Sequence, residues 1–266
     1  MKLIVLGTGS AMVEELYNTC FVLDNSEKGK MLIDTGGGNQ ILYRLKKANV
    51  NLAEIHDIFM THKHTDHILG LLWIIRKIEV LITKNIYEGN LTIYCHEDLE
   101  RIIRSLCELT LKKRYIDLLD NRIVFKVLKD REEIQLIGAK LTALDIQAKS
   151  DIQYGFKIEW ENKKLVFSGD EPLIEALYDI SLNSDYLCHE AFCLDSDADI
   201  YTPYKFNHDT AKSAAEKAKK LNVKNLILWH TREEYGNIRE SSFKEEARRY
   251  FDGNVIVPND FDIIEL

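Results

Sequence analysis

The order of the predicted elements indicates an α/β protein, in which two mixed β-sheets pack face to face and helices cover both outer faces. This arrangement is a four-layer αββα sandwich. Strand-like segments are followed by helix-like segments twice along the 266-residue chain, and a hydrophobic content of 45% can supply a large core. Only three prolines and no Ser/Gly-rich stretch interrupt the sequence. We therefore expect a single domain over residues 1–266.

The first half of the chain contains short apolar runs bounded by turn residues, which are typical of strands. These runs lie at 2–6, 20–23, 30–33 and 58–60. Helical spacing of apolar residues follows at 40–48, at 69–80 and in the charged region 98–119. We interpret the last region as a helical insertion at about 97–119.

The second half repeats the order of strands and then helices. Strands are predicted at 122–126, 134–137, 140–146, 154–159 and 164–167, and Glu161 and Asn162 form the turn of a hairpin between the last two. Helices are predicted at 173–182, 210–221 and 240–250, with strands at 186–188 and 225–228 between them.

Composition excludes some classes of partner. A net charge of −8 and a pI near 5.6 oppose a protein that coats nucleic acid non-specifically. The apolar start of the chain ends too soon for a signal peptide, and no later run is long enough for a membrane span, so we expect no membrane contact. The five cysteines are odd in number and include no CxxC pair, which indicates reduced thiols in a cytoplasmic protein.

The most informative string is Thr61–His67, which holds three of the eight histidines. His62 and His64 stand two positions apart at a strand end and so project to the same side. Asp66 follows, with the last histidine, where the chain turns into a helix. Imidazole and carboxylate ligands together suit zinc or another first-row divalent ion. The string therefore predicts a metal site.

Two more candidate ligands stand just past predicted strands. Asp170 follows the apolar run 164–167, and His230 follows the run 225–228. Alone, each is an ordinary turn residue. Together with the histidine string, we interpret both as metal ligands.

These motifs resemble the metallo-β-lactamase superfamily, and specifically its ribonuclease Z and phosphodiesterase branch. The resemblance extends over residues 6–231 and implies the metallo-β-lactamase form of the predicted sandwich. The matching pieces are Leu6-Gly7-Thr8-Gly9-Ser10, Asn18-Thr19-Cys20, Leu32-Ile33-Asp34-Thr35-Gly36, the Thr61–His67 string, Ser168-Gly169-Asp170, His208-Asp209-Thr210-Ala211 and Trp229-His230-Thr231.

The resemblance also implies how the site works. Two ions, Zn²⁺ or Mn²⁺, would lie about 3.5–4 Å apart, and a metal-bound hydroxide would be the nucleophile. One ion would be held by His62, His64 and a third histidine, the other by Asp66, His67 and His230, with Asp170 bridging both. We assign two residues as catalytic: Asp66, as a ligand of the ions, and His208, which would protonate the leaving oxygen. Asp34 either orients a ligand histidine or caps a glycine turn.

The third histidine is missing from this sequence. In the ribonuclease Z branch it stands six residues before a Gly-aromatic pair, which is Gly155-Phe156 here, and that position holds Lys149. An ammonium group there would repel a dication. Three possibilities remain open: a substituted ligand, Asp151 or Asp145; a single ion at Asp66, His67 and His230; or Lys149 in place of one cation. We therefore expect one or two ions per chain.

The sequence favours a metal-dependent hydrolase of the phosphodiesterase type, acting on RNA or on a small cyclic or nucleotide diester. Ribonuclease Z enzymes carry a projecting arm that grips transfer RNA, and the segment between Lys149 and Asp170 has room only for a hairpin. Two alternatives remain: a lactone, ester or thioester hydrolase of the same fold, and a catalytically impaired metal- or ligand-binding protein, suggested by Lys149. A homodimer is expected by analogy alone.

Overall fold

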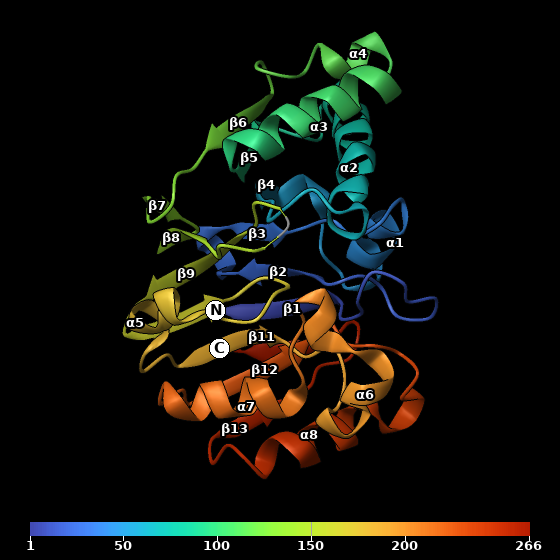
Figure 1. The fold of residues 1–266 in the computed structure, drawn as a ribbon. Coiled ribbons are helices and arrows are strands. Elements are labelled where there is room, and N and C mark those ends of the chain that lie inside the picture. The colour runs from blue at the N-terminus through green and yellow to red at the C-terminus, as the bar shows by residue number, and fades with distance from the viewer. Residues whose placement is uncertain (150) are drawn as a thin grey trace.

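The computed structural model describes residues 1–149 and 151–266 and arranges them in four layers (Figure 1). Two seven-stranded sheets lie face to face, and helices cover their outer faces. Each sheet combines an antiparallel half with a parallel half, so both are mixed. The αββα sandwich predicted from the sequence is therefore confirmed.

The first sheet is built from the N-terminal half of the chain and the last strand. Its order is β14-β1-β2-β3-β4-β5-β6. The parallel strands β3 to β6 are joined by crossover helices on the outer face, as parallel pairing requires. The bounds are β1 (Lys2–Gly7), β2 (Cys20–Asp24), β3 (Lys30–Ile33), α1 (Gln40–Lys47), β4 (Ile55–Phe59), α2 (Thr65–Thr83), β5 (Leu91–Cys95), α3 (Glu97–Thr110), α4 (Lys113–Ile116), β6 (Ile123–Val127) and β14 (Ile263–Glu265).

The second sheet repeats this plan with the order β13-β12-β11-β10-β9-β8-β7. Strands β7 to β10 pair antiparallel, and β10 to β13 pair parallel. The bounds are β7 (Glu133–Leu136), β8 (Ala139–Asp145), β9 (Tyr154–Trp160), β10 (Lys163–Phe167), α5 (Tyr178–Ser181), β11 (Tyr186–Glu190), α6 (Ala198–Tyr201), α7 (Ala211–Lys220), β12 (Asn225–Trp229), α8 (Arg239–Arg248) and β13 (Asn254–Ile256).

The core between the sheets is aromatic. The ring of Phe21 on β2 lies 4.6 Å from Trp229 and 5.3 Å from Phe167, measured between ring centroids. Phe59 and Phe156 pack edge to face at 5.2 Å. Such pairs contribute roughly 0.5–1.5 kcal/mol beyond the burial of their area. Phe59, Phe167 and Trp229 are the last residues of β4, β10 and β12, so this packing fixes where the segments after these strands begin.

Helix α2 is the longest helix, with 19 residues, and its buried side chains recur at helical spacing. They include Ile68, Leu71, Ile75 and Ile78, which pack onto the first sheet. Within residues 1–149 and 151–266, no helix combines the length and apolar character that crossing a membrane requires.

Several element predictions were wrong. Strand β5 was not predicted, although Leu91–Cys95 is a short apolar run, and the short strands β13 and β14 were also missed. The region 98–119 is not one helix, because it is interrupted at Leu111 and Lys112 between α3 and α4. The segment 173–182 holds only single turns, a 3₁₀ turn at Glu175–Leu177 and the short α5.

The two ends of the chain pair with each other in the first sheet. Strand β14, at the C-terminus, pairs antiparallel with β1, at the N-terminus, with Lys2 opposite Glu265. The chain therefore returns to its first sheet after completing the second. We propose on this ground that residues 1–266 form one domain, with α3 and α4 as its helical insertion.

Candidate metal centre

The predicted ligands lie in loops that follow three strands. The string 62–67 occupies the connection from β4 to the first turn of α2, where His64 is the N-cap residue. Asp170 follows β10 and His230 follows β12, and these strands run parallel with β11 between them. The carboxyl ends of parallel strands meet at one edge of a sheet. The topology therefore brings Asp170 and His230 together.

One carboxylate oxygen forms the middle of the cluster. The Oδ2 atom of Asp170 lies 2.6 Å from Nε2 of His67, 3.3 Å from Nε2 of His230 and 3.6 Å from Nε2 of His62. Asp66 Oδ2 lies 3.1 Å from the same nitrogen of His67. Ligand atoms of Asp66, His67, Asp170 and His230 all lie within 4.8 Å of one another. The structure thus brings together residues that are up to 164 positions apart in the sequence.

His62 and His64 form the second part of the cluster. The Nε2 atom of His62 lies 2.9 Å from Nδ1 of His64. His62 is buried, whereas the side chain of His64 is 46% exposed at the mouth of the site. Nε2 of His62 therefore lies between two other candidate donors, Nδ1 of His64 at 2.9 Å and Asp170 Oδ2 at 3.6 Å.

The residues fit a divalent cation by a test that does not depend on the resemblance. Among the described residues, Nε2 of His67 and both ring nitrogens of His230 are buried without a hydrogen bond of acceptable geometry. Buried polar atoms normally find a partner. A cation would satisfy both groups at once.

The electrostatics agree with this fit. Burial lowers the pKa of His62 and lowers that of His230 to about 4, which keeps both imidazoles neutral, as ligands must be. Burial opposes ionisation of Asp170, but the charges of His230 and His67 outweigh it and lower the pKa. Burial also opposes a charge on His67, yet Asp170 and Asp66 raise its pKa. The site favours positive charge at its centre.

A chain of hydrogen bonds orients two of the ligand histidines. Asp34 Oδ2 lies 2.7 Å from Nδ1 of His67 and accepts a 2.7 Å hydrogen bond from the hydroxyl of Thr61. The same hydroxyl lies 2.8 Å from Nδ1 of His62 and accepts from it. Both rings are therefore held with Nε2 toward Asp170. Thr61 was not singled out by the sequence analysis.

Close packing of α2 sets the distance from Asp34 to His67. A Cβ atom on Gly70 would lie 2.0 Å from the carbonyl oxygen of Thr35, so only glycine fits there. The backbone N–H of Thr35 donates to the His67 carbonyl at 3.0 Å, and that of Gly70 donates to Gly36 at 2.9 Å. The helix start is thus tied to the loop that carries Asp34.

We expect Thr61→Val to weaken metal binding about 10- to 100-fold, because valine keeps the shape but removes the hydroxyl that contacts Nδ1 of His62 and donates to Asp34. Calorimetric titration of the metal-free protein with zinc measures this. The matched control is Thr142→Val, since Thr142 is also buried but its hydroxyl has no partner in the described structure. Equal affinities in both variants would contradict an orienting role for Thr61.

His208 lies beside this cluster and is held by a buried carboxylate. Its Nδ1 atom lies 3.1 Å from the carbonyl oxygen of Asp170, and 3.5 Å from Oε2 of Glu190 at the end of β11. The ring stacks on Phe192 at 4.6 Å between centroids, with an interplanar angle of 9°. The His208 ring is therefore fixed, and Nε2 remains for a substrate.

His208 is protonated near neutral pH, and Glu190 ionises in the same range. Burial raises the pKa of Glu190 to about 7. Burial alone would lower the pKa of His208, but the hydrogen bonding and charge of Glu190 outweigh it and raise the pKa to about 9. His208 thus holds a proton at the pH at which a general acid is needed. The sequence analysis missed Glu190, although a charged residue ending the apolar run Tyr186–Cys188 was a usable signal.

The missing third histidine is not replaced by Lys149. Lys149 is exposed, and its backbone N–H donates to Glu171 at 3.3 Å. Asp151 lies 3.2 Å from Nε2 of His64, the nitrogen on the far side of the ring from His62, and 2.5 Å from Nζ of Lys63. Asp145 Oδ1 instead accepts from the backbone of Gln147. Asp151 therefore contacts a ligand histidine from outside.

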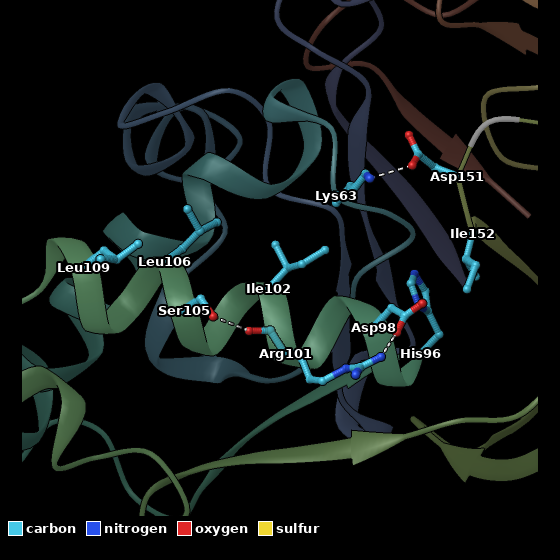
Figure 2. Close-up of a pocket in the computed structure, with 10 residues that line it drawn as sticks. All are labelled: Lys63, His96, Asp98, Arg101, Ile102, Ser105, Leu106, Leu109, Asp151 and Ile152. Carbon is cyan, nitrogen blue, oxygen red and sulfur yellow. Dashed lines mark hydrogen bonds and ion pairs between the residues drawn. The ribbon is translucent and has the colours of Figure 1, made fainter.

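A groove of about 620 Å³ adjoins the site. Figure 2 shows it between α3 and the segment of Asp151 and Ile152, with Lys63 facing Asp151 at one end. Its wall along α3 is apolar, formed by Ile102, Leu106 and Leu109. The groove shares Asp151 with the His64 contact, so it opens next to the cluster. The smaller pocket of about 110 Å³ over the cluster itself is lined by Ala11, His64, Asp66, Gln153, Asp170, Glu171, Phe206, His208 and His230.

Known proteins share this architecture. The family model described as "Anti-Pycsar protein Apyc1" matches residues 1–205. A ribonuclease Z from Archaeoglobus fulgidus is 26% identical in an alignment of 314 positions that covers 100% of this chain and 97% of the relative. The metallo-beta-lactamase fold protein YhfI from Bacillus subtilis superposes with a TM-score of 0.80 at 19% identity, covering 99% of this chain and 98% of YhfI. A diphosphatase from the PhnP family gives a TM-score of 0.76 at 19% identity, covering 100% of this chain and 97% of that one.

The fold, the sequence relatives and the cluster of histidines and aspartates define a protein of the metallo-β-lactamase superfamily, in its ribonuclease Z and phosphodiesterase-like branch. The superfamily predicted from the sequence is therefore confirmed. Within this class, the chain belongs to the Anti-Pycsar protein Apyc1 family, whose model covers more than three quarters of its length.

Proposed function

We propose that this protein is a metal-dependent phosphodiesterase that hydrolyses a small cyclic or nucleotide diester. The observation that carries the proposal is the juxtaposition of Asp170, with three imidazole nitrogens around one of its oxygens, and the charged pair of His208 and Glu190. A cation site beside a fixed proton donor suits the cleavage of a P–O bond. Relatives named ribonuclease Z and a diphosphatase of the PhnP family support the same class of reaction.

Different residues of this chain would bind the ions and donate the proton. The ions, Zn²⁺ or Mn²⁺, would be held by His62, His64, Asp66, His67, Asp170 and His230. A divalent cation there supplies Lewis acidity toward the phosphoryl oxygens. His208 would donate its proton to the leaving oxygen, while Glu190 keeps the imidazole charged and fixed.

A small substrate is favoured over transfer RNA. The described segment before Asp170 contains a tight hairpin in which Trp160 pairs with Lys163, and this supports the proposal that the protein lacks a projecting arm. The alignment with the Archaeoglobus relative runs over 314 positions, more than the 266 residues of this chain, so that relative carries additional segments. The groove beside His64 offers apolar side chains on α3 that suit a base. Its two cations, Lys63 and Arg101, pair with Asp151 and Asp98, so an anionic phosphate would have to compete with these carboxylates.

The proposal is tested with the protein stripped of metal and reloaded with zinc or manganese. We expect turnover of bis(p-nitrophenyl) phosphate and of 3′,5′-cyclic nucleotides, and its loss in Asp66→Ala. Asp66 is buried and lies 3.1 Å from Nε2 of His67. Precursor transfer RNA, a lactone and a thioester complete the panel. Acyl turnover without phosphodiester turnover, or phosphodiester turnover that persists without metal, would overturn the proposal.

A further inference from the structure

We propose that Gln153 supplies the donor that replaces the missing third histidine, through its side-chain amide oxygen. The first ion would then be held by Nε2 of His62, Nδ1 of His64, a carboxylate oxygen of Asp170 and Oε1 of Gln153. This inference rests on the metal centre of the proposed function and identifies the residue that completes it.

The backbone around Gln153 is held against the histidine string. The N–H of the next residue, Tyr154, donates to the carbonyl oxygen of Thr61 at 3.0 Å, and the carbonyl of Gln153 accepts from Ile146 at 3.0 Å. Thr61 is the immediate neighbour of His62. Gln153 therefore stands immediately before β9, in the segment between position 149, where the histidine was expected, and the Gly-aromatic pair.

The amide oxygen of Gln153 has no hydrogen-bond partner in the described structure. Gln153 is 2% exposed, and its Oε1 atom is buried without a hydrogen-bond partner. The residue lines the small pocket with His64, Asp66, Asp170 and His230. A buried amide oxygen without a partner costs about 1–3 kcal/mol. A cation in that pocket would remove this cost.

The other oxygen donors near His64 are occupied. Asp151 contacts the outer nitrogen of His64 and pairs with Lys63, so it orients the ligand instead of replacing one. Asp145 caps the turn at Gln147 through its Oδ1. Glu171, at the rim, accepts from the backbone of Lys149. Gln153 is thus the buried donor in this part of the described chain that has a free oxygen.

The exchange of an imidazole for an amide oxygen changes the chemistry of the first site. Carbonyl and carboxylate oxygens suit manganese and magnesium, whereas imidazole suits zinc. A neutral amide oxygen is also a weaker donor to zinc than an imidazole. We therefore expect two unequal sites: a tight one at Asp66, His67 and His230, and a weaker one at His62, His64 and Gln153 that accepts manganese readily.

The test measures metal binding and does not depend on turnover. Metal-free protein is titrated calorimetrically with Mn²⁺ and with Zn²⁺, and the variants are Gln153→Met, Gln153→Glu and the control Gln135→Met. Methionine keeps the length of the side chain but lacks the oxygen, glutamate restores an oxygen with a charge, and Gln135 is an exposed glutamine on β7. Circular dichroism establishes that each variant is folded.

We expect two ions per wild-type chain, and an affinity for the weaker Mn²⁺ that falls roughly 10- to 100-fold in Gln153→Met. The tighter ion should change less than threefold, Gln153→Glu should bind the weaker ion at least as well as wild type, and Gln135→Met should match wild type. An unchanged weaker site in Gln153→Met, or a single ion in the wild type, would overturn the inference. Absence of phosphodiester turnover with these affinities intact would refute the proposed function alone.

Discussion

Replacing Asp170 with asparagine is expected to lower kcat for a phosphodiester by about 10³-fold, because a bound cation contributes several kcal/mol of charge stabilisation and each 1.4 kcal/mol is tenfold in rate. The physical reason is the position of its Oδ2 atom, within 3.6 Å of ring nitrogens from His62, His67 and His230. Asparagine keeps the shape but removes the charge that balances the ions. Elemental analysis should show fewer than one ion per chain.

The control for this variant is Asp252→Asn, a surface aspartate whose side chain is 84% exposed. It should keep wild-type kcat and metal content. If Asp170→Asn retained both ions and at least a tenth of the activity, Asp170 would not be the shared ligand. The cluster would then need another explanation, such as a buried charge network without a metal.

Replacing His208 with alanine is expected to lower kcat about 10²- to 10⁴-fold, the usual contribution of a positioned general acid. Metal content should stay at the wild-type value, because His208 is not one of the predicted ligands and reaches Asp170 only at its backbone carbonyl. Its ring also lies beside that of His230, at 5.5 Å between centroids. Activity toward a substrate with a p-nitrophenolate leaving group should fall less, since that group leaves without a proton. Equal losses for good and poor leaving groups would contradict the role as acid.

Glu190→Gln tests the residue that acts through His208. Glu190 raises the pKa of His208 to about 9, so the protonated acid is present below that pH and activity is lost as the pH rises through it. Without the carboxylate charge, burial lowers the pKa of the imidazole. The alkaline limb of the kcat profile should therefore move to lower pH, and a variant that is only destabilised would not shift it.

The variants at Asp170 and those at His208 and Glu190 distinguish metal binding from proton transfer. Asp170→Asn should change metal content and rate together, whereas His208→Ala and Glu190→Gln should change rate with metal retained. The distinction follows from geometry, because Glu190 lies at the end of β11 and faces His208, not the centre of the cluster.

Much of the fold could be predicted from the sequence because its signals are local. Short apolar runs and helical spacing identified most strands and the long helices, and the hairpin turn at Glu161 and Asn162 lies where predicted. Strand β5 was missed because a five-residue apolar run after a long helix is ambiguous by periodicity alone. The segment 173–182 was overpredicted because its apolar residues pack against the second sheet without helical hydrogen bonds beyond single turns.

The sequence by itself determined three features of the site, because each depends only on neighbours along the chain. They are the string of histidines and aspartate, the positions of Asp170 and His230 after strands, and the lysine at position 149 where a histidine was expected. The tertiary structure alone decided which side chains surround the site of the missing histidine. It turned Lys149 outward, set Asp151 behind His64, brought Gln153 into the pocket, and joined Glu190 to His208. Those contacts come from the pairing of strands and the packing of two sheets, which bring together side chains that no local pattern relates.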